Sequence, residues 1–162
     1  MTTDRIERVI VLRAPPRRVW RALSDATEFG HWFGITFQER FVPGATVHGV
    51  ISGTKVDPEA ARAMESVVGV PLVITIERME PEKVFSFRWH PHASDRSVDY
   101  SEEPTTLVVF ELEAVPGGTR LKVTESGFDR VPSHRRRAAF EANSAGWDMQ
   151  MTLVGKHLDR AP

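Results

Sequence analysis

The chain has 162 residues, of which 41% are hydrophobic and 27% are charged, the size and composition of one globular domain over residues 1–162. Lys and Arg total 21 against 22 Asp and Glu, so the chain lacks the positive charge that favours nucleic-acid binding. Cys is absent, which excludes disulfides, thiolate nucleophiles and Cys-based zinc sites. No signal-like run follows Met1 and no apolar stretch is as long as a membrane span, so we expect a cytoplasmic protein.

The first predicted elements are one strand and two short helices. A β-branched run predicts a strand over 5–13, which ends at a Pro-Pro pair, and the residues after that pair predict a helix over 17–25. A second short helix over 28–33 is expected to end at a glycine. Trp20 in the first helix and Trp32 in the second are then predicted to face the interior.

The middle of the chain is predicted to be mainly β-strand. Alternating apolar residues predict strands over 37–42 and 46–53, joined by a turn at Pro43-Gly44. The sequence from Asp57 onward is typical of a helix start, and it predicts a short helix or lid. Further strands are predicted over 72–77, 85–89, 107–115 and 119–126. The polar, acidic segment 90–104 is expected to be an exposed loop.

A long amphipathic helix is predicted from Pro132 or Ser133 to the end of the chain. Its apolar side consists of Phe140, Trp147, Met151, Val154 and Leu158. A helix with such large side chains, laid on a curved sheet, leaves a space that suits an apolar small molecule. Gly146 inside this helix costs about 1 kcal/mol relative to Ala, which indicates a close approach there by a strand or a ligand.

The order of elements and several local motifs resemble one protein family. The motifs are Trp20–Asp25, His31–Phe33, Phe85–Trp89, Gly118–Leu121, Glu125–Asp129, Asn143 and Gly146-Trp147. They are similar to the AHSA-type branch of the SRPBCC superfamily, which also holds the START and birch-pollen-allergen proteins. The resemblance implies an α+β helix-grip fold: a curved antiparallel sheet of about six to seven strands wrapped around a long C-terminal helix, with two short helices after the first strand. It also implies a heat-shock chaperone as a candidate partner.

Nine apolar side chains are candidates for lining a ligand cavity. They are Trp20, Trp32, Phe33, Phe85, Phe87, Trp89, Phe110, Trp147 and Met151. The alternative is that these residues simply fill a core, which is the commoner fate of an aromatic residue at helical or strand spacing.

Glu125 is the most informative polar residue because it shares a strand face with Leu121 and Val123, and so should point toward the last helix. A buried carboxylate needs a partner or a proton. One interpretation is a general acid or base, or a group that hydrogen-bonds a ligand. The other is a structural anchor, bonded to a nearby Arg or to backbone. Arg88 and Tyr100 are further candidates for orienting the polar end of a ligand.

Metal and cofactor signals are weak. His90-Pro91-His92 with Asp95 could be read as a metal cluster, but the intervening proline and the absence of zinc-type spacing argue against it. No glycine-rich phosphate loop is present, so we expect neither a metal nor another cofactor. The arginines before Ser24 and the run Arg135–Arg137 could contact an acidic partner or form a solvated surface.

Three functions follow as hypotheses. The first is a ligand-binding protein that holds a hydrophobic small molecule, such as a lipid, a polyketide-like compound or an aromatic compound, between the sheet and the C-terminal helix. The second is a chaperone-associated protein that stimulates a heat-shock chaperone ATPase. The third is a cyclase or hydrolase with Glu125 as base, although a non-catalytic role is favoured. The sequence leaves a homodimer open.

Overall fold

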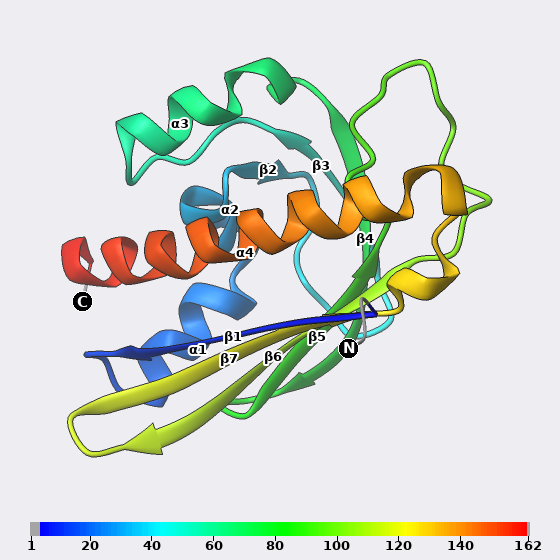
Figure 1. Cartoon of the computed structure of the whole chain (residues 1–162). Helices are drawn as coiled ribbons and strands as arrows, with labels where there is room; N and C mark the ends of the chain where they lie inside the picture. Colours follow the sequence, from blue (N-terminus) through cyan, green and yellow to red (C-terminus); the bar gives the residue numbers. More distant parts are fainter. Residues whose placement is uncertain (1–3, 162) are drawn as a thin grey trace.

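An antiparallel sheet curves around the last helix in the computed structural model, which describes residues 4–161 (Figure 1). Its seven strands are β1 (Arg5–Leu12), β2 (Ile35–Phe37), β3 (Thr46–Ile51), β4 (Pro71–Glu80), β5 (Val84–Trp89), β6 (Thr106–Val115) and β7 (Gly118–Ser126). They follow the spatial order β1-β7-β6-β5-β4-β3-β2, so chain neighbours from β2 to β7 pair directly and β1 closes against β7. This arrangement confirms the predicted α+β helix-grip fold.

The helices gather on the concave side of the sheet. They are α1 (Pro16–Ser24), α2 (Ala26–Phe33), α3 (Pro58–Met64) and α4 (Ser133–Arg160), with short 3-10 turns η1 (Glu65–Val67) and η2 (Phe128–Arg130). Figure 1 shows α4 crossing the sheet, with α3 lying over the end that holds β2 and β3. Contacts of α4 with β1 and with α2 fix its position above the sheet. None of the helices described is long and apolar enough to cross a bilayer.

Local capping sets the ends of the short helices. The Asp25 side chain accepts a hydrogen bond of 2.9 Å from the Glu28 amide at the start of α2, and Gly34 ends that helix with a φ of +96°. The Asp57 side chain accepts from the amides of the first turn of α3, where Pro58 holds the first helical position. The predicted short helix after Asp57 is therefore confirmed.

The predicted strand over 37–42 is wrong. Strand β2 ends at Phe37, and the chain then leaves the sheet until β3 begins. The cause is Phe41, which is buried and packs between Phe29 and Phe85 with ring centroids 5.7 and 5.5 Å away. Burial of this ring in the core outweighs continued strand pairing. The turn near Pro43-Gly44 does form, since the Ala45 amide donates to the Val42 carbonyl.

A buried polar cluster fixes the C-terminal end of α4. His157 lies 2.8 Å from Glu28 of α2, and Arg18 of α1 forms an ion pair with the same carboxylate. Arg18 also donates to the carbonyl of Ala161 over 2.9 Å. Burial raises the pKa of Glu28, but hydrogen bonds from His157 and Arg18 outweigh it, and the pKa lies below its usual value. The end of α4 is thus tied to both short helices.

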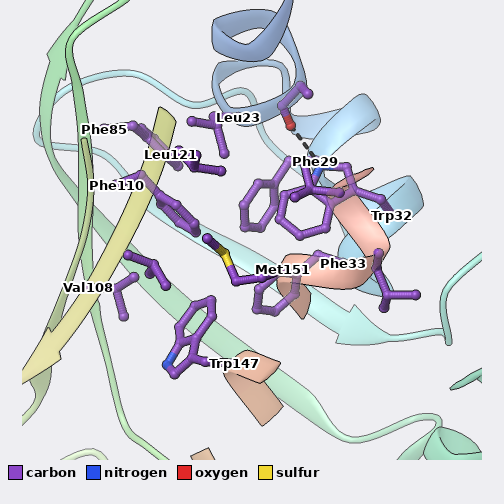
Figure 2. Close-up of a cluster of buried hydrophobic side chains, with 14 of the residues drawn as sticks. Leu23, Phe29, Trp32, Phe33, Phe85, Val108, Phe110, Leu121, Trp147 and Met151 are labelled. Atoms are coloured by element: carbon purple, nitrogen blue, oxygen red, sulfur yellow. Dashed lines mark hydrogen bonds between the residues drawn. The ribbon is translucent and has the colours of Figure 1, made fainter. Parts of the chain in front are cut away.

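Aromatic side chains fill the space between the short helices and the sheet. Phe29 lies at the centre of the cluster in Figure 2 and packs edge-on to Phe85, Phe87 and Phe110 of the sheet at centroid distances of 6.1–6.3 Å. Trp32 stands beside Phe29 and is fully buried, its indole N–H donating to the Ala22 carbonyl. The interior is therefore solid at this end of the sheet.

No described residue makes the close approach that was expected at Gly146. A Cβ built there meets no atom within 4 Å among the described residues, so a strand approach is excluded. At Gly30 of α2, by contrast, an added Cβ would lie 2.1 Å from the Ile35 carbonyl oxygen. The two helical glycines thus have opposite reasons for lacking a side chain.

The pair Gly30→Ala and Gly146→Ala tests this difference. Gly30→Ala should lower the free energy of unfolding by about 1–3 kcal/mol, because α2 must move away from β2. Gly146→Ala should raise it by about 0.5–1 kcal/mol, because only helix propensity changes. Urea unfolding monitored by tryptophan fluorescence measures both values, and equal shifts for the two variants would contradict the packing described.

Candidate functional site

Four neutral side chains donate hydrogen bonds to the buried carboxylate of Glu125. Trp147 Nε1 lies 2.8 Å from Oε1, and Trp89 Nε1 lies 2.8 Å from Oε2. Thr106 Oγ1 lies 2.6 Å from Oε2, and Asn143 Nδ2 lies 2.9 and 3.2 Å from the two oxygens. Glu125 itself has no exposed surface. These donors occupy the acceptor positions of the carboxylate.

The fold brings these partners together from three elements. Glu125 faces inward from β7, as its strand parity predicted, with Val108 of β6 opposite it in register. Trp89 ends β5 and Thr106 begins β6, while Asn143 and Trp147 lie one turn apart on α4. None of the ion pairs among residues 4–161 involves Glu125. The expected partners, an Arg or backbone, are therefore wrong, and the carboxylate anchors α4 to the sheet through neutral donors.

The position of Glu125 is unfavourable for a catalytic base. A base must reach the proton that it abstracts. Glu125 is enclosed by its four donors and presents no exposed oxygen to a substrate. Its geometry is that of a satisfied polar anchor.

A mainly apolar cavity lies at the flank of the sheet, next to α3 and away from the filled interior. We call it the flank cavity; its volume is about 270 Å³. Its apolar wall is formed by Phe33, Ile35, Ile51, Met64, Val67, Val70, Leu72, Trp89, Ala93 and Met149. Polar side chains of His90, His92, Ser94, Asn143 and Gln150 also line it. A smaller hollow of about 120 Å³, the amide recess, is lined by Phe33, Trp89, Asn143, Gly146, Trp147 and Gln150. The two spaces share four of these residues.

The structure separates the nine candidate apolar residues into three groups. Phe33 and Trp89 line the flank cavity, and Trp147 lines the amide recess. Trp32, Phe85, Phe87, Phe110 and Met151 lie in the packed core (Figure 2). Trp20 is half-buried beside a basic surface hollow.

Neither Arg88 nor Tyr100 belongs to the wall of the flank cavity, and Tyr100 lines an adjoining hollow of about 370 Å³ that shares Trp89, His90 and Ala93 with it. Arg88 forms an ion pair of 2.7 Å with Glu77, on the side of β5 opposite to Phe87. The Tyr100 ring lies under the guanidinium of Arg135 at 4.8 Å. Neither side chain is therefore among the residues that line the flank cavity.

Sequence reasoning missed Asn143 and Gln150 as members of the cavity wall. Both lie on the buried side of α4, in the same stripe as Trp147. The sequence does contain a signal for them, because a polar side chain within an otherwise apolar helical stripe is either satisfied internally or available to a ligand. The prediction of the cavity wall used only the apolar residues of this stripe.

The loop after β5 is held against α4 and closes one side of the flank cavity. Arg135 donates to the Pro91 carbonyl over 2.7 Å and to Glu103 over 2.8 Å. His90 donates from Nε2 to the Glu103 carbonyl, 2.9 Å away. Within residues 4–161, no three His, Asp or Glu side chains come together as metal ligands. The His90–His92 segment forms part of the wall of the flank cavity.

The run Arg135–Arg137 is largely used within the molecule. Arg135 is bound as described, and Arg136 donates to the Val131 carbonyl over 3.0 Å. Arg137 is exposed and pairs with Glu141 one turn along α4. This run therefore offers little free positive charge to a partner.

Comparison with known proteins identifies the family. The family described as activator of Hsp90 ATPase homolog 1-like protein matches residues 13–158. The chain belongs to this family. A comparison with curated proteins finds no match.

Several solved structures share the fold of this chain. Protein MLL2253 from Mesorhizobium loti is 23% identical, with a TM-score of 0.70 and 98% of both chains covered. A Bordetella parapertussis protein is 25% identical, with a TM-score of 0.67 over 100% of this chain and 78% of that one. DynU16, a putative protein in the dynemicin biosynthetic locus, is 20% identical, with a TM-score of 0.66 over 96% of this chain and 47% of that one.

Glu125→Gln tests the anchor. Wherever the new amide nitrogen points, it faces at least one N–H that needs an acceptor, so the free energy of unfolding should fall by about 2–4 kcal/mol. The matched control is Glu113→Gln, at an exposed position on neighbouring β6. It should change the free energy of unfolding by less than about 0.5 kcal/mol. Guanidinium unfolding gives both numbers; a Glu125→Gln value as small as the control's would contradict the anchoring role.

Proposed function

We propose that this protein binds a small, mainly apolar molecule in the flank cavity. The observation that carries the proposal is an apolar space of about 270 Å³ with a few polar side chains at one end. Such a combination is typical of small-molecule sites. Membership of a family with a ligand-binding fold supports it. The ligand would lie between α3, the sheet edge and α4, and not in the filled centre of the sheet.

The size of the cavity limits the ligand. Small-molecule sites usually have volumes of about 300 to 1,000 Å³, and the flank cavity lies just below that range. A two-ring aromatic compound or a short acyl chain matches this space, with the adjoining amide recess adding about 120 Å³. Among the classes expected from the sequence, small aromatic molecules are therefore favoured over full-length lipids.

The roof of the cavity is suited to admitting a ligand. Met64 of α3 and Val67 of η1 contribute to it, and methionine adapts its shape easily. This insert lies between Gly53 and Gly69, which have φ values of +85° and +92°. Arg96 ties the insert to the loop after β5 by donating to the Val68 carbonyl over 2.8 Å. A small outward movement of the insert would open the apolar wall to solvent.

Ala93→Trp tests the proposed site by filling it. Ala93 lines the flank cavity from the loop after β5, so the added indole should occupy the space and weaken binding of 2-methylnaphthalene at least about tenfold. Ala138→Trp, at an exposed position on α4, is the matched control and should bind like the wild type. Calorimetry and ligand-observed NMR measure the affinities. Equal binding by both variants would place the ligand elsewhere and refute this site.

A second candidate function is supported by the basic hollow beside Trp20. The hollow has a volume of about 510 Å³ and is lined by Arg13, Arg17 and Arg21, among others. Arg13 and Arg17 are exposed and have no ion-pair partner within the described part of the chain. We propose that an acidic protein surface docks here, with a chaperone of the Hsp90 type as the candidate that the family description suggests.

Charge reversal at this hollow tests the docking function. Arg13→Glu combined with Arg17→Glu should weaken binding to an Hsp90-type chaperone by about tenfold or more, because attraction becomes repulsion. Arg137→Glu changes an exposed arginine outside the hollow and should leave the affinity unchanged. Surface plasmon resonance gives the affinities, with chaperone ATPase turnover as a second readout. If the wild type neither binds nor stimulates the chaperone, this function is rejected.

A further inference from the structure

We infer that the flank cavity selects an uncharged ligand carrying an O–H or N–H donor and discriminates against carboxylates. This inference rests on the proposed ligand-binding function and deepens it. It depends on two amide side chains of α4, on the glycine between them and on the charges around the cavity.

Gln150 provides the first observation. Its side chain is only 7% exposed, and its amide nitrogen donates to the Phe33 carbonyl over 3.0 Å. That bond fixes the orientation of the amide, because the nitrogen cannot be exchanged with the oxygen without losing it. The oxygen, Oε1, is buried and has no hydrogen-bond partner among the described residues. A buried carbonyl oxygen without a donor is uncommon and calls for an explanation.

Asn143 provides the second observation. Its amide nitrogen is committed to the Glu125 carboxylate, so its orientation is also fixed. No donor to its Oδ1 is present within residues 4–161, and the side chain lines both the flank cavity and the amide recess. Asn143 Oδ1 and Gln150 Oε1 thus both lack a donor within residues 4–161, while the two amide nitrogens serve the protein. The Asn143 side chain is half-buried and lines both spaces, and Gln150 Oε1 is enclosed beside it.

Gly146 explains how a ligand group could fit between these amides. Residues 143, 146 and 150 lie on one side of α4, at helical spacings of three and four. Within residues 4–161, no atom outside the helix's own turn lies within 4 Å of a Cβ built on Gly146, and the residue lines the amide recess. The missing side chain leaves room for a hydroxyl or amine hydrogen to approach the carbonyl oxygens. Space for a ligand group would explain why a glycine occupies position 146 inside α4, where no packing contact with the described residues requires one.

The charges around the cavity exclude an anion. No Lys, Arg, Asp or Glu is among the residues that line the flank cavity. A carboxylate ligand would therefore meet no Lys or Arg side chain on the wall itself, and the nearby Arg96 and Arg135 already donate to the Val68 and Pro91 carbonyls. Glu125 lies behind the wall, one hydrogen bond beyond Trp89 and Asn143, and forms no ion pair with any residue that the structure describes. A second carboxylate placed nearby would meet its field at close range.

Three probes of similar size separate the possibilities: 2-naphthol, 2-methylnaphthalene and 2-naphthoate. At pH 7 the wild-type protein should bind 2-naphthol about tenfold more tightly than 2-methylnaphthalene, because the hydroxyl satisfies a buried acceptor. Binding of 2-naphthoate should be at least about tenfold weaker than that of 2-naphthol. Calorimetry and ligand-observed NMR give the three affinities.

Two variants test whether the amide recess causes the preference for 2-naphthol over 2-methylnaphthalene. Gln150→Met should reduce the advantage of 2-naphthol over 2-methylnaphthalene to about twofold or less, while affinity for 2-methylnaphthalene stays the same. Gln38→Met, which lies outside the cavity lining, is the matched control and should keep the full preference. Gly146→Ala should weaken 2-naphthol selectively by filling the recess, and since it should stabilise α4, it remains informative if Gln150→Met fails to fold.

The outcomes separate this inference from the proposed function. Equal affinities for the three probes, with binding lost in Ala93→Trp, would overturn the donor preference and leave the flank cavity as the ligand site. Tightest binding of 2-naphthoate would also overturn it. Absence of saturable binding by all three probes would overturn both proposals.

Discussion

The structure depends on one buried carboxylate whose hydrogen bonds come from neutral side chains. Glu125 receives hydrogen bonds from Trp89, Thr106, Asn143 and Trp147, which come from β5, β6 and α4. A buried charge is costly unless every acceptor position is filled, so these elements can occupy only an arrangement that fills them all. The crossing of α4 over the sheet is therefore specified by polar geometry as well as by apolar burial.

The same network connects the anchor to the proposed site. Trp89 and Asn143 contact Glu125 on one side and line the flank cavity on the other. Donation to the carboxylate holds the Asn143 amide in one orientation and leaves its oxygen without a donor among the described residues. A structural requirement thereby sets the hydrogen-bonding character of the cavity wall. This coupling connects a buried carboxylate of the sheet to the wall of the proposed site.

Large aromatic side chains fill the space between the centre of the sheet and α4, where the sequence predicted the cavity. Phe29 brings Phe85, Phe87 and Phe110 into one cluster, and these rings fill the centre of the concave face. The remaining space lies at the flank, where α3 and η1 cover the sheet edge near β2 with smaller aliphatic side chains. Filling the centre stabilises the fold by burying apolar area, and the less densely packed flank contains the cavity proposed as the binding site.

By itself, the sequence determined the elements and their faces. Period-two alternation identified most strands and the inward direction of Glu125, and the apolar stripe identified α4, because these patterns arise from local backbone geometry. The failed strand over 37–42 shows the limit, since the burial of Phe41 against rings distant in sequence overrode the local pattern. Only the tertiary structure decided which aromatic residues fill the core, which line a cavity, and which donors meet Glu125. Those outcomes depend on side chains that meet across the fold, and no local spacing encodes such meetings.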